Sequence, residues 1–312
     1  MNQIYRKSPF WSLAGPMLGY LAIQFVVQFA AQLVIEMPYV MRAYAEILRG
    51  SSDTVPSMQE LLNSYMQTLE PAFEAIVRYQ VEIAALSALS TIVLTGILFA
   101  RDRKLEQKAG VILPERAPLS KYWTVVIFGI AGCIAATCLM AMVQLAFYDE
   151  QYQQTAQITY SAGLLVQIIG LGIITPVAEE LMFRGILYKR FRERQGFWYS
   201  ALWSSLLFSF MHSNTTQMVY TFLLGVLLSY LYEKFGSFKA PLVLHILLNT
   251  GSVVFTELGV FRYLTGSPAR MAGAVIAGAF LCSVMFVVIQ RMPVRIENRL
   301  NTNDTDRHDM FS

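Results

Sequence analysis

Charged residues are scarce in this sequence. Only 14% of the 312 residues are Asp, Glu, Lys or Arg, whereas 55% are hydrophobic. Soluble domains carry about 25% charged residues, because their surfaces must interact with water. So low a share excludes an ordinary soluble protein and predicts that lipid is the main solvent of the chain.

Cysteine and histidine are also rare, with three residues of each. Cys133, Cys138 and Cys282 lie within apolar runs, where cysteine usually behaves as a small buried hydrophobe. They form no CxxC pair, so the sequence predicts neither a disulfide framework nor a cysteine metal site.

Several patterns typical of other protein classes are missing. We find no duplication of the kind that many transporters carry and no HExxH pair of a zinc protease. Ser204, Ser205 and Ser209 are not enclosed by a GxSxG nucleophile elbow, so we do not expect a serine nucleophile. The formal net charge is +3, but the basic residues flank apolar runs, so we expect no nucleic-acid partner.

Long apolar runs predict an all-α, polytopic membrane bundle of about eight helices. A transmembrane helix needs about 20 mostly apolar residues. The predicted spans are 11–35, 79–100, 122–147, 160–178, 197–213, 216–233, 239–257 and 271–290. With the N-terminus inside, 19 of the 24 Lys and Arg residues fall in inner segments. Because cytoplasmic loops are enriched in Lys and Arg, we expect a cell (plasma) membrane protein with both termini in the cytoplasm.

Three regions follow from this pattern. Residues 1–120 form an N-terminal transmembrane region with a long outer segment, 36–78, in which 56–78 is compatible with an amphipathic helix on the outer surface. Residues 121–290 form the core that carries most of the unusual polar residues. Residues 291–312 are predicted to form a polar cytoplasmic tail.

Ionisable residues within the fourth span are the first sign of chemistry, because charges in lipid are costly and usually functional. The stretch ITPVAEELMFRGILYKR contains Glu179, Glu180 and Arg184. Residues four apart share a helix face, so we expect Glu180 to pair with Arg184 as a structural support. Glu179 points about 100° away, toward a polar cavity in which it could accept a proton. The alternative is an interfacial charge cluster at the inner end of the span. Pro176 is expected to kink this helix and re-aim the carboxylates.

Two further spans each contain a histidine with a partner four residues away. Phe208 and His212 share one helix face, and so do His245 and Asn249. His245 and Asn249 could both donate N–H groups to a developing oxyanion, as acyl transfer requires. His212 could share a water molecule with Glu179. Phe208 is expected to act through packing.

In this order across successive spans, the three motifs EExxxR (Glu179–Arg184), FxxxH (Phe208–His212) and HxxxN (His245–Asn249) resemble the CAAX-protease and bacteriocin-processing (CPBP, or Abi) membrane family. The resemblance covers roughly residues 120–290. It implies a helical bundle with a buried, water-accessible site, in which Glu179 and His212 activate water while His245 and Asn249 form the oxyanion site. Characterised members cleave prenylated CAAX proteins, and many bacterial relatives are linked to bacteriocin processing, self-immunity or peptide maturation.

The chain is therefore expected to be an intramembrane endopeptidase acting on a membrane-associated protein or peptide. Family members are often labelled metalloproteases, and a zinc ion held by Glu179, His212 and His245, with Glu180 as base, is the alternative to a reaction without a cofactor. We favour the reaction without metal, because pairing with Arg184 would weaken Glu180 as a base. A non-catalytic immunity or scaffold protein and a proton-coupled transporter remain the alternatives from other classes.

Overall fold

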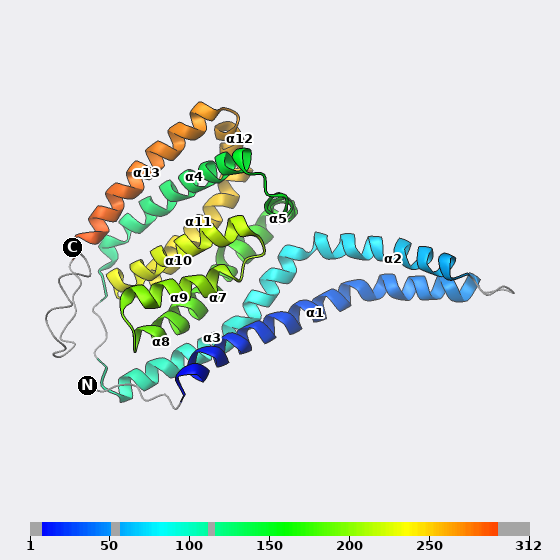
Figure 1. The fold of residues 1–312 in the computed structure, drawn as a ribbon, viewed down its shortest axis with the longest axis horizontal. Coiled ribbons are helices and arrows are strands. Elements are labelled where there is room, and N and C mark those ends of the chain that lie inside the picture. Colours follow the sequence, from blue (N-terminus) through cyan, green and yellow to red (C-terminus); the bar gives the residue numbers. More distant parts are fainter. Residues whose placement is uncertain (1–7, 51–56, 112–115, 293–312) are drawn as a thin grey trace.

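The protein is an all-helical bundle from which one pair of helices projects (Figure 1). The computed structural model describes residues 8–50, 57–111 and 116–292, and within them every regular element is helical. In chain order the elements are α1 (Pro9–Gly50), α2 (Met58–Arg78), α3 (Gln80–Lys108), η1 (Leu119–Lys121), α4 (Trp123–Ala146), α5 (Glu150–Ser161), α6 (Leu164–Val166), η2 (Gln167–Ile174), α7 (Thr175–Glu180), η3 (Leu181–Tyr188), α8 (Lys189–Arg192), α9 (Phe197–Ser209), α10 (Thr215–Phe235), α11 (Lys239–Glu257), α12 (Val260–Thr265) and α13 (Pro268–Gln290).

Seven helical stretches of the described chain are long and apolar enough to cross a bilayer. They are Phe10–Glu46, Gln80–Lys108, Leu119–Ala146, Leu164–Arg192, Thr215–Phe235, Lys239–Glu257 and Pro268–Gln290. This confirms the predicted polytopic all-α bundle and an integral membrane protein. Most of the predicted tail, 293–312, lies outside the described residues.

The fourth span was placed wrongly by the sequence. It was expected over 160–178, which left the two glutamates at its inner end, but the structure has a continuous helical stretch from Leu164 to Arg192. The charged residues of its second half are buried or partly buried in the bundle, so they do not end the span. Glu179 consequently lies near the middle of a 29-residue stretch.

The fifth predicted span, 197–213, is also corrected. Its helix, α9, has 13 residues, which at 1.5 Å per residue gives about 20 Å, less than the roughly 30 Å of a bilayer core. The turn that follows α9 carries His212. A short α9 therefore brings His212 back toward the depth of Glu179, which straight full-length helices would not allow.

The N-terminal region is built differently from the expected span plus surface segment. α1 continues without a break through 42 residues, and α2, which confirms the helix expected over 56–78, packs back along it. The far half of this pair extends away from the other helices (Figure 1). Near its beginning, α1 is attached to the bundle by Arg190, which donates to the carbonyl of Ser12 and pairs with Asp102 of α3 at 2.8 Å.

Candidate active site

The two adjacent glutamates lie in α7, a short α-helical piece between the π-helical stretches η2 and η3. π-Helical turns are rare and occur mostly at functional sites. Pro176 lies at the change from η2 to α7, and because proline has no N–H one earlier carbonyl of the helix loses its backbone donor. Two side chains of α11 donate to carbonyls of this stretch. Asn249 Nδ2 donates to the carbonyl of Leu171 at 3.1 Å, and the Thr250 hydroxyl donates to that of Gly172 at 3.3 Å.

Close backbone approach supports this junction. A Cβ at Gly172 would come within 2.6 Å of the Thr250 hydroxyl, and one at Gly170 within 2.8 Å of Ala85 on α3. Glycine at both positions therefore lets η2 pack tightly between two helices. Gly163, by contrast, has open space around it.

Glu180 and Arg184 form the predicted pair. The guanidinium NH1 lies 2.8 Å from Glu180 Oε1, and both side chains are 0% exposed. Arg184 also donates to the carbonyl of Gly225 at 3.1 Å and lies 4.6 Å from the centre of the Phe208 ring. Two buried atoms, Glu180 Oε2 and Arg184 Nε, have no hydrogen-bond partner among the described residues. The pair is therefore charge-compensated but not fully hydrogen-bonded.

His245 lies between the two carboxylates. Its Nδ1 is 3.0 Å from Glu180 Oε1, and its Nε2 is 3.6 Å from Glu179 Oε2. An ionised carboxylate can only accept a hydrogen bond, so Nδ1 carries a proton. Nε2 then faces Glu179, as a proton acceptor in the neutral ring and as a donor in the protonated one.

His212 has its tautomer set in the same way. Its Nδ1 lies 3.2 Å from the carbonyl oxygen of Phe208, which accepts the ring N–H. Its other nitrogen, Nε2, is left as a proton acceptor. The Phe208 ring lies edge-to-face with both imidazoles, 5.2 Å from His212 and 5.9 Å from His245. Phe208 thus separates and orients the two rings, in agreement with the packing role predicted for it.

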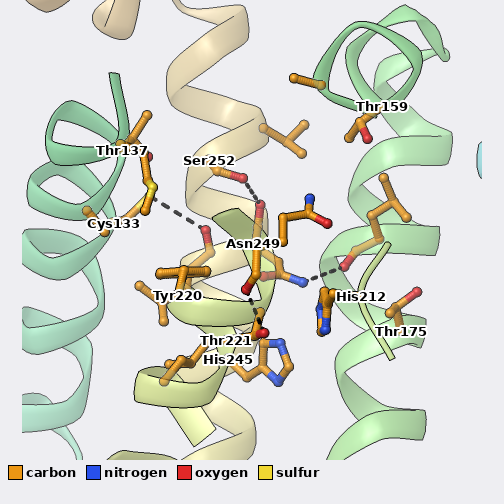
Figure 2. A pocket seen from close by; sticks show the side chains of 18 of the residues that line it. Cys133, Thr137, Thr159, Thr175, His212, Tyr220, Thr221, His245, Asn249 and Ser252 are labelled. Carbon is orange, nitrogen blue, oxygen red and sulfur yellow. Dashed lines mark hydrogen bonds between the residues drawn. The ribbon is translucent and has the colours of Figure 1, made fainter. Parts of the chain in front are cut away.

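A cavity of about 320 Å³ brings the predicted residues together. Glu179, His212, His245 and Asn249 all line it, and they come from α7, the turn after α9, and α11. Figure 2 shows His212, His245 and Asn249 around this cavity. Glu180, Arg184 and Phe208 are not part of its wall but lie directly behind it. The hydroxyls of Ser204 and Ser209 donate to carbonyls of their own helix.

The alternative zinc set is not assembled. Glu179 and His245 approach each other at 3.6 Å, but the described parts of the chain contain no group of three or more His, Cys, Asp or Glu side chains placed to hold a metal ion. Zinc needs four ligands at about 2.0–2.3 Å, three of them usually from protein in a catalytic site. We therefore derive no step through a metal.

The sequence did not predict that α5 forms part of the cavity wall. The short polar helix α5 contributes Tyr152, Thr159 and Tyr160 to the lining. It begins at Asp149, whose carboxylate accepts from the Thr216 hydroxyl at 2.7 Å and from the Tyr152 backbone N–H at 3.1 Å. These hydrogen bonds lower the pKa of Asp149. The amphipathic pattern of α5 is too short and too polar to mark it as part of a site.

Comparison with known proteins points to the same part of the chain. Residues 161–251 match the family model described as Type II CAAX prenyl endopeptidase Rce1-like. The matched segment contains all three motifs and the residues that meet at the cavity. The match over this segment confirms the resemblance to the CAAX-protease and bacteriocin-processing family.

Two curated relatives are similar to the chain over part of its length. "Putative membrane peptidase YdiL" of Bacillus subtilis (strain 168) is 28% identical over 116 residues, 37% of this chain and 47% of that protein. "Uncharacterized 24.3 kDa protein" of Escherichia coli is 32% identical over 97 residues, 30% of this chain and 45% of that protein. The chain spans about half the length of the curated relatives it matches. No solved structure matches it.

Proposed function

We propose that the protein is an intramembrane endopeptidase that hydrolyses a peptide bond of a membrane-associated protein or peptide without a metal ion. The observation that supports this most directly is the meeting of four polar side chains from three separate segments at one cavity. Polar residues within a membrane bundle are costly, so their convergence calls for a chemical role.

Glu179 is the general base. It is the carboxylate that reaches the cavity, with 15% of its side chain exposed, whereas Glu180 is fully buried and paired with Arg184. A water molecule between Glu179 and Nε2 of His212 loses its proton to Glu179 as its oxygen attacks the carbonyl carbon of the substrate. His212, with Nδ1–H held by a carbonyl, shares that proton.

His245 and Asn249 stabilise the oxyanion. The second N–H of the Asn249 amide is free for the substrate, because only one is needed for the carbonyl of Leu171. The protonated His245 ring offers Nε2–H while Glu180 holds Nδ1–H. When the tetrahedral intermediate collapses, the C–N bond breaks and the amine leaves with the proton that Glu179 had taken.

Membrane peptides of cells that carry Glu179→Gln or wild-type protein test this function. We expect an uncleaved precursor to accumulate in Glu179→Gln and His212→Ala cells at equal membrane levels of protein. Glu257→Gln is the matched control, because this exposed carboxylate at the end of α11 lies away from the cavity. Identical peptides in wild-type, Glu179→Gln and His212→Ala cells would leave a non-catalytic role as the better account.

A further inference from the structure

The cavity lies toward the end of the bundle that α5 caps (Figure 1). Its lining comes from 133–140 of α4, 216–224 of α10 and 245–253 of α11, from Leu171, Thr175 and Glu179 of the η2–α7 stretch, from His212 and from α5. The Thr216 hydroxyl, at the start of α10, donates to Asp149 at the start of α5, so the part of α10 that lines the cavity is the half nearer α5. The site is therefore closer to water at the α5 end than at the opposite end.

The opposite half is closed by packing. Phe235, Ala240, Leu244 and Tyr188 are all 0% exposed and fill the space between the helices beyond Glu180. Arg184, Phe183 and Phe208 are among the largest fully buried side chains of the described chain. We see no lining residue of the cavity among these plugging side chains.

Basic residues identify which side of the membrane each end faces. The closed end carries four Lys or Arg residues within 101–108 and four more within 189–194. The segments at the α5 end that border the cavity, 147–163 and 210–214, contain none. By the positive-inside rule the closed end is cytoplasmic and the α5 end is extracytoplasmic.

The charge of the cavity restricts the class of ligand that it can bind. Glu179 is its one carboxylate, and within the described chain no Lys or Arg side chain lines it. Arg184 is fully buried and engaged behind Glu180. A free C-terminal carboxylate of a substrate would meet the like charge of Glu179 there, with no Lys or Arg side chain to pair with.

We infer that the cavity admits an uncharged or cationic peptide segment from the extracytoplasmic side and takes it as an internal stretch of chain rather than as a C-terminal carboxylate. The substrate in this inference rests on the proposed endopeptidase function. The side of entry and the charge preference are properties of the cavity itself, so both are tested without any cleavage reaction.

Thiol labelling of the full chain tests the side of entry. In a background with Cys133, Cys138 and Cys282 changed to Ala, single cysteines are introduced by Thr159→Cys or Gln217→Cys, which line the cavity on two different elements. We expect a membrane-impermeant maleimide to label both in spheroplasts and neither in sealed inside-out vesicles. Gln195→Cys, at an exposed position after α8, is the matched control and should show the reverse. Labelling of the cavity positions from the cytoplasmic side, from both sides or from neither would overturn the inference.

Charged thiol reagents test the charge preference of the cavity. Thr175 lies one helical turn from Glu179 and lines the same cavity. In Thr175→Cys we expect a cationic methanethiosulfonate to react several-fold faster than an anionic one, after each rate is divided by its rate with a free thiol in solution. Adding Glu179→Gln should reduce that ratio toward one. An anionic reagent that reacts as fast in the presence of Glu179 would refute the charge preference. If labelling is as expected but no precursor accumulates in Glu179→Gln cells, the proposed function alone is refuted.

Discussion

Removing the charge of Arg184 should destabilise the protein strongly, because it leaves Glu180 as a buried carboxylate without its cation. Arg184→Met keeps most of the side-chain volume and removes three contacts: the 2.8 Å pair with Glu180, the donation to the carbonyl of Gly225, and the cation over the Phe208 ring. The pair is 0% exposed on both sides, so water does not compensate for the loss.

The magnitude follows from the geometry. Two unit charges about 4 Å apart at an effective dielectric constant near 20 interact with about 4 kcal/mol, and breaking a buried ion pair from one side typically costs about 3–5 kcal/mol. His245 Nδ1–H still donates to Glu180 at 3.0 Å and offsets part of this. We therefore expect a loss of about 3 kcal/mol, which lowers the melting temperature by roughly 6–12 °C in a chain of this size.

Thermal unfolding in detergent, followed by helical circular dichroism, measures the effect. Combining Glu180→Gln with Arg184→Met removes both charges and should recover most of the lost stability, because neither partner is then left uncompensated. Arg103→Gln is the control. Its pair with Glu106 is 3.7 Å long and partly exposed, and Glu106 keeps Lys189 at 2.6 Å, so we expect a change below about 1 kcal/mol. An Arg184→Met protein that melts within about 2 °C of wild type, or a double variant no more stable than the single one, would refute the reasoning.

Four further predictions follow from the same contacts. Gly225→Ala should destabilise by about 1–3 kcal/mol in thermal unfolding, because its Cβ would lie 2.7 Å from a serine Cβ, whereas Gly163→Ala, with nothing within 4 Å, should not. Asn249→Leu should lower the melting temperature, because it leaves the partly buried carbonyl of Leu171 without a donor at a cost of about 1–3 kcal/mol, and it should also lower proteolysis. Proteolysis should survive removal of metal with a chelator and dialysis; a loss that zinc restores would contradict the metal-free route. The Thr216 hydroxyl lowers the pKa of Asp149, so their hydrogen bond stabilises the fold at pH values above the ordinary pKa of 3.8. This stabilisation is lost as the pH falls through the lowered pKa. Thr216→Val should therefore show a weaker dependence of the melting temperature on pH between about pH 6 and pH 3.

The sequence predicted the class of fold because apolar runs of sufficient length report directly on lipid. It failed at the ends of spans where charge is compensated inside the protein. The apolar run 160–178 ends before Glu179. The helical stretch nevertheless continues to Arg192, because Arg190 is paired with Asp102 and Lys189 with Glu106. Those partners lie in α3, more than 80 residues away, so no local sequence pattern predicts the two pairs.

The run 197–213 failed for the opposite reason. Its composition is apolar throughout, but α9 ends at Ser209 and the next four residues form the turn that carries His212. Periodicity and hydropathy do not distinguish a short helix plus a buried turn from a full span. The four predicted site residues were nonetheless brought together, because the motifs mark residue types and spacing rather than depth. Asn249 was assigned to the oxyanion alone, whereas in the structure it also donates to the carbonyl of Leu171, on a helix 78 residues away in the sequence.

The distinct surroundings of the two adjacent glutamates come from burial, not from their order in the motif. On an ideal helix their side chains diverge by about 100°, so each glutamate would be expected to contact a different helix. Instead both contact the His245 imidazole, Glu180 at Nδ1 and Glu179 at Nε2. Glu180 is 0% exposed and shares its Oε1 with Arg184, so it holds the proton on Nδ1 and has little freedom to do anything else. The other nitrogen is thereby directed at Glu179 and the cavity. In the proposed function, Glu180 orients the ring and Glu179 contacts the substrate. This arrangement depends on α11 being held against η2 by Asn249 and Thr250.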